Sequence, residues 1–426
     1  MSHPRATTEA PDGDGPCEVR FRRAVTALMI AGLLGSMILL IVIGSADAFA
    51  ALTFAGRVTG FLFVASGLVQ GAAAAAAFDY WGKRRWRHSG AVTLIGALIA
   101  LFTSGLLVLL WFQEREYTPY ALAYFPLLCW SLWALRLLGG ERAWRGIPHP
   151  KGFAAGVTAT ALLASTNLAY SAVYQPYSLP VQFAVDITFG NPVMDPGRKI
   201  VNLPVTIRTE NTGKVASYIL NSSYQVMGRS AAFEEKSRDL TGWKTDVKRR
   251  FDAERYVGPA REEIINTGPV IRAGTWLETG DVQVEQRVAQ IPANAGYDLV
   301  RATTVIALLR KDRGKIGPEF EIPRHSWDPD QARFFACPPE CEDQVLHSGR
   351  VVHNNNIVNV TREPRHVYSR WTTGKDSTHV RLTISPAKSK GKASADDESY
   401  DQYGVFWVGS GVATVPFAAL TDPAPE

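Results

Sequence analysis

Cys337 and Cys341 are the residues of this sequence whose types and spacing indicate the most specific chemistry. They enclose the segment Cys337-Pro-Pro-Glu-Cys341. Outside the cytoplasm, two cysteines this close together usually form a disulfide. The ring would be short, so its stabilisation is expected at the low end of the roughly 2–4 kcal/mol range. We therefore predict a Cys337–Cys341 disulfide that pins a loop, with free thiols as one alternative.

A zinc site is a second alternative, because Cys and His side chains are the usual zinc ligands. Four histidines follow the cysteine pair, namely His347, His353, His366 and His379. The Cys-x3-Cys and His-x5-His spacings lie at or beyond the limits of zinc motifs, and a redox Cys-x-x-Cys motif has one residue fewer between its cysteines. We therefore predict no metal and no cofactor.

Other candidate motifs have simpler interpretations. The segment Gly374–Ser377 looks like a phosphate loop, but it lacks the upstream glycine and the following helix, so it is predicted to be a hairpin turn. Adjacent carboxylates in expected loops are read as solvated charge: Glu262/Glu263, Asp328/Asp330, Glu342/Asp343 and Asp396/Asp397. No Gly-x-Ser-x-Gly motif sets up a serine nucleophile. We therefore predict no catalytic residue.

The first part of the chain predicts a membrane domain at residues 24–174, after a disordered tail at 1–23. A bilayer core of about 30 Å needs roughly 20 apolar residues in a helix. Five stretches meet this requirement: Ala24–Ser45, Val58–Phe78, Ala91–Phe112, Tyr120–Leu138 and Phe153–Tyr174. The chain is thus expected to be a multi-pass plasma-membrane protein of bacterial type, with the lipid bilayer as a partner.

Basic residues in short loops predict the orientation, because they concentrate on the cytoplasmic side. One side carries twelve of them: Arg5, Arg20, Arg22, Arg23, Lys83, Arg84, Arg85, Arg87, Arg136, Arg142, Arg145 and Lys151. The other side carries only Arg57 and Arg115. The N-terminus is therefore expected in the cytoplasm, and with five spans everything after Tyr174 lies outside.

Small residues at four-residue spacing, just before and within the second span, indicate close helix packing, which serves either this one bundle or a homo-oligomer. They are Gly56, Gly60, Gly67 and Gly71. The spans hold few charged residues, which disfavours a transporter. The net charge of +5 is modest and arises largely from the loops, so it does not indicate nucleic acid.

From residue 175 onward the pattern changes to alternating β-branched residues, which predict strands. The strands expected first are Val181–Thr188, Ile200–Arg208, Val215–Val226, Asp281–Ile291 and Tyr297–Leu309. Their number and spacing predict an antiparallel sandwich of immunoglobulin-like type at 175–318. A helical insertion is expected at 230–256, which packs on the sandwich or lies on a membrane or partner.

A second β module is expected at 319–420, and residues 421–426 as a frayed end. Its predicted strands are Gly349–His353, Ile357–Thr361, His366–Thr372, His379–Ser385, Gly404–Val408 and Val412–Phe417. The alternative is that this segment completes the first sandwich.

Two function classes follow. The first is a binding protein whose extracytoplasmic β region meets a protein or a cell-envelope partner. The alternative is a membrane-bound enzyme acting on lipid or cell-wall material. The enzyme hypothesis would be favoured if one pocket contained His347, His353 and His366. A scattered arrangement of these histidines would count against it.

Overall fold

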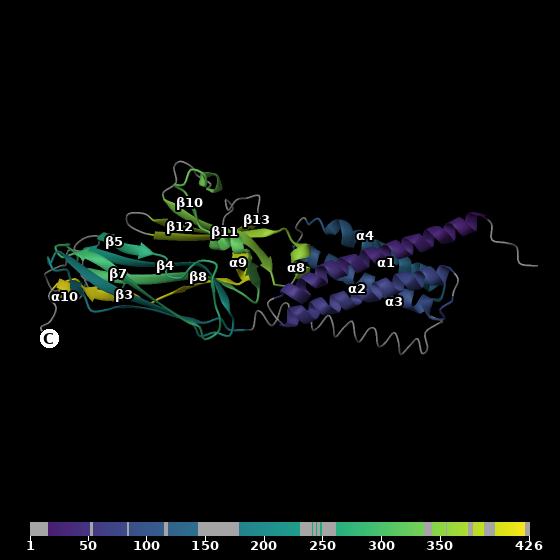
Figure 1. The fold of residues 1–426 in the computed structure, drawn as a ribbon, viewed down its shortest axis with the longest axis horizontal. Helices are drawn as coiled ribbons and strands as arrows, with labels where there is room; N and C mark the ends of the chain where they lie inside the picture. Colours follow the sequence, from purple (N-terminus) through teal and green to yellow (C-terminus); the bar gives the residue numbers. More distant parts are fainter. Residues whose placement is uncertain are drawn as a thin grey trace, which may run out of the picture. The chain divides into compact units, whose positions relative to one another are not determined.

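The computed structural model describes two compact units. The described residues are 16–51, 54–82, 85–114, 118–143, 179–230, 241, 244, 248, 261–335, 343–354, 356–373, 378–386 and 397–421. A helical unit comprises residues 1–175 together with 355–363, and a β unit comprises 176–354 and 364–426. Figure 1 shows the elements of each unit.

The helical unit contains the apolar helices α1 (Pro16–Ala50), α2 (Phe54–Trp81), α3 (Ser89–Glu114) and α4 (Ala121–Gly140). Within the described residues, four helices are long and apolar enough to cross a membrane. The first four predicted spans thus coincide with helices that could cross a membrane, which supports membrane association of the chain. The fifth predicted span, Phe153–Tyr174, lies outside the described residues, so it stays a prediction.

Three of the predicted small residues lie against α1. A Cβ atom on Gly60 would stand 2.2 Å from the backbone nitrogen of Ala48, and one on Gly67 would stand 2.9 Å from Ile41. Gly71 faces the sulfur of Met37. These glycines therefore allow α1 and α2 to approach closely. Self-association through Gly56, Gly60, Gly67 and Gly71 stays an untested prediction.

A short helix from the C-terminal half of the sequence, α8 (Asn356–Thr361), belongs to the helical unit. Its Ile357 and Val360 are buried in one cluster with Ile43 of α1 and Tyr124 of α4. The prediction of a strand at Ile357–Thr361 was therefore wrong. The β-branched residues that suggested a strand are apolar contacts of a helical turn, and tertiary packing overrides their β propensity.

The β unit contains antiparallel sheets, as the alternating pattern predicted. A four-stranded sheet joins β1 (Phe183–Phe189), β3 (Ile200–Asn211) and β2 (Val193–Met194), with β7 (Val282–Pro292) on the other side of β3. Within the described residues, the sheet has four strands. Of these, β1, β3 and β7 confirm three of the predicted strands.

A six-stranded sheet is built around two long strands, β4 (Ser217–Ser230) and β8 (Leu299–Arg310), within the described segments. The others are β5 (Arg261–Gly268), β6 (Trp276–Leu277), β14 (Val405–Gly409) and β15 (Ala413–Pro416). Both β14 and β15 pair with β8, so residues near the end of the chain join this sheet.

The remaining described strands form a five-stranded sheet, hereafter the outer sheet. Its strands run in the order β10 (Arg324–His325), β11 (Gln344–His353), β12 (Arg365–Thr373) and β13 (Thr378–Pro386), and β9 (Gly314–Ile316) also pairs with β11. The short helices are η3 (Pro318–Glu321), η4 (Ala332–Phe334), α9 (Asp397–Tyr403) and α10 (Ala418–Thr421).

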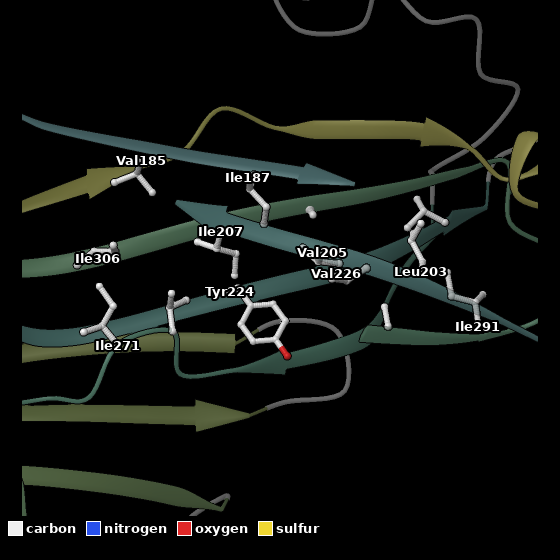
Figure 2. Packing of buried hydrophobic residues seen from close by; sticks show 14 of the residues in the cluster. Val185, Ile187, Leu203, Val205, Ile207, Tyr224, Val226, Ile271, Ile291 and Ile306 are labelled. Atoms are coloured by element: carbon white, nitrogen blue, oxygen red, sulfur yellow. The ribbon is translucent and has the colours of Figure 1, made fainter. Parts of the chain in front are cut away.

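Two apolar cores hold the three sheets together. Figure 2 shows the first, where Ile187 and Ile207 of the four-stranded sheet meet Tyr224 and Val226 of β4. The second core lies on the opposite face of β4 and β8 and includes side chains of the outer sheet. The six-stranded sheet is therefore the middle layer, which explains why most of β4 is buried on both faces.

A bulge in β4 serves both cores. The pairing of β4 with β8 shifts between Ile219 and Asn221. Ile219 lies in the first core, whereas Leu220 lies in the second. Asn221 then donates a hydrogen bond through Nδ2 to the Ser369 hydroxyl of the outer sheet at 2.8 Å. The irregularity thus directs three consecutive side chains to the contacts that join the layers.

The predicted helical insertion at 230–256 lies largely outside the described residues, where only Thr241, Lys244 and Lys248 are seen, as exposed helical positions. The division of the β half at residue 319 stays a prediction, as does its immunoglobulin-like type. The structure supports a mostly β region with antiparallel sheets in sandwich packing.

Candidate functional site

The outer sheet has one apolar face and one polar face. Val351, Val367, Leu382 and Ile384 point into the second core. Because side chains alternate along a strand, the residues between them lie on the opposite face. This opposite face, called here the polar face, carries the candidate site.

Strand register places arginines side by side across the polar face. Arg324 of β10 pairs with Leu346 of β11, Leu346 pairs with Arg370 of β12, and Arg370 pairs with Arg381 of β13. These four residues form one row across four strands. We call Arg324, Arg370 and Arg381 the arginine row.

The neighbouring row is made of hydroxyl side chains. Ser348 pairs with Tyr368, and Tyr368 pairs with Thr383. The Arg324 guanidinium donates a hydrogen bond to the Ser348 hydroxyl. It also lies 4.1 Å from the centre of the Phe334 ring in η4, a cation–π contact that fixes its position. The hydroxyl row and the arginine row thus adjoin each other on this side of the sheet, where Leu346, Ser348 and Thr383 are buried and Arg381 is exposed.

The charges of this surface act on each other. Burial raises the pKa of the Tyr368 hydroxyl, and the positive charges of Arg370 and Arg324 oppose this change. Burial lowers the pKa of the Arg370 guanidinium, and Arg381 acts in the same direction. Positive charge therefore accumulates around Tyr368, at the centre of the polar face.

The next row along the strands contains Arg350, His366 and Ser385. Glu319 of η3 adjoins it, since its carboxylate accepts a hydrogen bond from the Arg350 backbone N–H at 2.8 Å. This bond is the main reason that the pKa of Glu319 is lowered. Burial lowers the pKa of His366, and Glu319 opposes that shift. One end of the polar face thus includes a carboxylate.

The histidines considered as metal ligands do not gather. His366 lies on the polar face, whereas His347 is offset by one residue from Ser348 and lies on the opposite face. The Nδ1–H of His347 donates to the Phe320 carbonyl at 2.9 Å. Within the described parts of the chain, no group of three or more His, Cys, Asp or Glu side chains could hold a metal ion.

Cys337 and Cys341 lie outside the described residues, so their disulfide stays a prediction. The same holds for the turn at Gly374–Ser377. Glu262 and Glu263 lie in β5 rather than in a loop, which corrects the sequence prediction. Glu262 contacts Arg301 at 3.3 Å, and Glu263 accepts a hydrogen bond from the Tyr297 hydroxyl at 3.0 Å. Both therefore have structural partners within the β unit.

Sequence reasoning missed the arginine row, although one signal was available. The segment Gly374–Ser377 had been identified as a hairpin turn. Residues equally far from its centre face each other, which puts Arg370 opposite Arg381. The contribution of Arg324 could not have been found in this way, because β10 is distant from this hairpin in sequence and pairs with β11.

Comparisons with known proteins add little. No family model and no curated protein matches the chain. It is similar in structure to an ApaA protein from Bordetella pertussis, with 13% identity and a TM-score of 0.19 over 31% of this chain and 81% of that chain. It is also similar to the sporulation control protein Spo0M from Bacillus subtilis, with 10% identity and a TM-score of 0.17 over 56% and 91%. TM-scores this low carry no argument.

Proposed function

We propose that this chain is a membrane-anchored binding protein whose β unit meets an anionic partner in the cell envelope. The observation that carries the proposal is the arginine row, in which Arg370 stands directly opposite Arg381 in the sheet. Like charges in this arrangement destabilise a sheet. Arginine side chains bind carboxylates and phosphates through paired hydrogen bonds, so a row of arginines favours an anionic partner.

The proposal includes an orientation. Four apolar helices anchor the chain, and the sequence predicts a fifth span at Phe153–Tyr174. Basic residues of the loops face the cytoplasm, so five spans put the β unit outside. There, the three-layered β unit acts as an immunoglobulin-like scaffold that presents its polar face to the envelope.

Binding is favoured over catalysis by the placement of the histidines. An enzyme would need titratable groups that converge on one cleft. His347 and His366 lie on opposite faces of the outer sheet, and the polar face offers mainly hydrogen-bond donors with fixed positive charge. Such a surface holds anions but provides no evident acid and base pair.

The proposal is tested with the full-length protein in nanodiscs of neutral lipid. Fluorescent polyanions, one a glycerol-phosphate polymer and one polyglutamate, are titrated and their anisotropy is followed. We expect at least one polymer to bind, and added salt to weaken the binding because it screens exposed charges. The double variant Arg370→Gln/Arg381→Gln should bind more weakly.

Arg208→Gln is the matched control, because Arg208 is an exposed arginine of the four-stranded sheet that pairs with Glu210 at 2.6 Å. It should leave binding unchanged. The double variant separates binding at the β unit from binding at the basic cytoplasmic loops, which nanodiscs leave accessible, and undiminished binding by the double variant would contradict the proposal. If neither polymer binds, or if Arg208→Gln weakens binding as much as the double variant, the proposal is wrong.

A further inference from the structure

The four-stranded sheet has one face that meets the first core and one face that does not. Figure 2 shows Leu203 and Val205 of β3 among the side chains of that core. Because side chains alternate along a strand, the residues between them lie on the opposite face. We call the outward residues of β3 between 200 and 206, together with their partners in β1, β2 and β7, the open face.

The open face carries no charged side chain, and all four of its strands lie within the described segments. Opposite Asn202, Pro204 and Thr206 of β3 stand Gln290, Val288 and Gln286 of β7. On the other side of β3, Thr188 of β1 and Val193 of β2 adjoin them. Charge begins only at the next row, where Asp186 stands opposite Arg208.

Several aliphatic side chains of the open face are in contact with solvent. Val193 is 59% exposed, Val288 is 50% exposed and Ile200 is 37% exposed. An antiparallel sheet with water on one side normally carries polar residues there. Exposed aliphatic groups without charge instead match the centre of a protein–protein interface, which has a charged and polar rim. Such a rim is present here, because Arg208 lies at one end of the face and Lys199 at the other.

We propose that the open face binds the open face of a second copy of this chain. In a two-fold interface the same patch meets itself, so a charged patch repels its own copy and an uncharged patch does not. Copies held by the same apolar helices also present this face at the same distance from the bilayer. The proposal goes beyond the anionic partner, because the open face and the polar face belong to different sheets.

The size of the open face indicates how strong this association is. Six residue steps along β3 give a length of about 20 Å, and two strand spacings give a width of about 10 Å. This area is smaller than the roughly 800 Å² per partner of a standard interface. Copies free in solution would therefore associate weakly. Copies anchored in one membrane have a higher effective concentration, so a small face is sufficient there.

The second copy meets the face of this sheet rather than its edge. β7 pairs with β3 on one side only, and an open strand edge can accept a strand of another chain. At Val288 this edge is occupied from within the chain, because Asn266 donates a hydrogen bond through Nδ2 to the Val288 carbonyl at 3.0 Å. The Val288 side chain is therefore available for a test of the face alone.

The test measures self-association of the full-length chain in vesicles of neutral lipid. Donor and acceptor fluorescent proteins are fused to the N-terminus of separate samples, which are reconstituted together over a series of protein-to-lipid ratios. We expect energy transfer between wild-type copies. Val288→Asp should weaken the association at least about tenfold, because two like charges would then be buried in each dimer. Val305→Asp is the matched control, since Val305 of β8 is 41% exposed and lies outside the open face.

A charge-reversed pair separates lost binding from lost folding. Copies with Val288→Asp mixed with copies with Val288→Lys should regain energy transfer, because opposite charges then meet across the interface. A variant that fails to fold cannot be restored in this way. Equal energy transfer in the wild type and Val288→Asp, or an equal loss in Val305→Asp, would overturn the proposal. It would also be overturned if the mixed variants regain no transfer, since the open face would then not meet its own copy.

Discussion

Asp47 and Asn356 are joined by a hydrogen bond although they stand 309 positions apart in the chain. The backbone N–H of Asn356 donates to Asp47 Oδ1 at 2.8 Å, and Asp47 is only 3% exposed. The Asn356 side chain also donates to the Ile43 carbonyl at 3.3 Å. At the other end of α8, the Thr118 hydroxyl donates to the Val360 carbonyl at 2.9 Å. The connection between β11 and β12 is therefore part of the helical unit.

The first prediction concerns this attachment. Asp47→Ala removes the acceptor and leaves the Asn356 N–H unpaired in a buried position, which costs about 1–3 kcal/mol. Amide hydrogen exchange of residues 356–361 should become faster, because local opening of α8 becomes easier. Asp47→Asn is the control, since its carbonyl oxygen can still accept. Unchanged exchange in Asp47→Ala would show that the bond does not hold α8.

The second prediction concerns the contact of α1 with α2. A Cβ atom at Gly60 would lie 2.2 Å from the Ala48 nitrogen and 2.7 Å from the Gly44 carbonyl oxygen, both backbone atoms that cannot move aside. We expect Gly60→Ala to destabilise the bundle by about 1–3 kcal/mol through overpacking. Gly35→Ala is the matched control, because its Cβ would meet only Leu127 at 3.6 Å. Thermal unfolding in detergent, followed by circular dichroism, gives both values. Equal unfolding temperatures for the two variants would contradict this packing.

The third prediction concerns a buried ion pair at the end of β8. Arg310 donates to both carboxylate oxygens of Asp312, at 2.9 and 2.7 Å, and the two side chains are 8% and 13% exposed. Asp312→Ala should destabilise the β unit by about 3–5 kcal/mol, because it leaves the arginine buried without its counter-charge. Pulse proteolysis in urea measures this loss.

The control is Glu285→Ala, which removes the partner of Arg287 in a more exposed pair at 3.0 Å. Pairs of this kind contribute about 0–1 kcal/mol. If Asp312→Ala and Glu285→Ala lower the free energy of unfolding by similar amounts, then burial does not make the Arg310–Asp312 pair more important for stability than the exposed pair.

The fourth prediction is a pH dependence. Burial lowers the pKa of His347 in the folded protein, while its hydrogen bond to the Phe320 carbonyl opposes the shift. The unfolded chain has a histidine pKa of about 6.5. As the pH falls, the unfolded state therefore takes up a proton before the folded state does. The stability that neutral His347 contributes above the unfolded pKa is lost as the pH falls towards the lower pKa of the folded protein.

His347→Gln removes the titrating group while keeping a hydrogen-bond donor. The stability difference between wild type and His347→Gln should be constant above about pH 7.5 and shift against the wild type below about pH 6.5, where unfolded histidine becomes protonated. Urea unfolding at pH 7.5 and 5.5 provides the comparison. A difference that does not change with pH would contradict a buried, neutral His347.

Much of the fold could be predicted from local patterns. Hydropathy located α1 to α4, and alternation located β1, β3, β4, β7 and β8, because each signal depends on a single segment. Asp47 shows the limit. The first span was predicted to end at Ser45, whereas α1 continues to Ala50 and buries Asp47. The partner that stabilises this helix end, α8, is remote in sequence.

The candidate site was harder to predict, because it depends on register between strands. Arg324 and Arg370 face outward on strands separated by β11, and only the pairings of Leu346 bring them into one row. The histidines illustrate the same limit. His347 and His366 were grouped as potential ligands by residue type, but register puts them on opposite faces.

The proposed function requires the β unit to lie outside the cytoplasm. The test uses a chain whose native cysteines are replaced by serine, with one cysteine introduced at Val412 or at Trp86. Val412 is 59% exposed in the β unit, and Trp86 is 61% exposed between α2 and α3. Intact cells are treated with a membrane-impermeant maleimide. We expect labelling at position 412 in intact cells, and at position 86 only after lysis; the reverse pattern would contradict the proposed function.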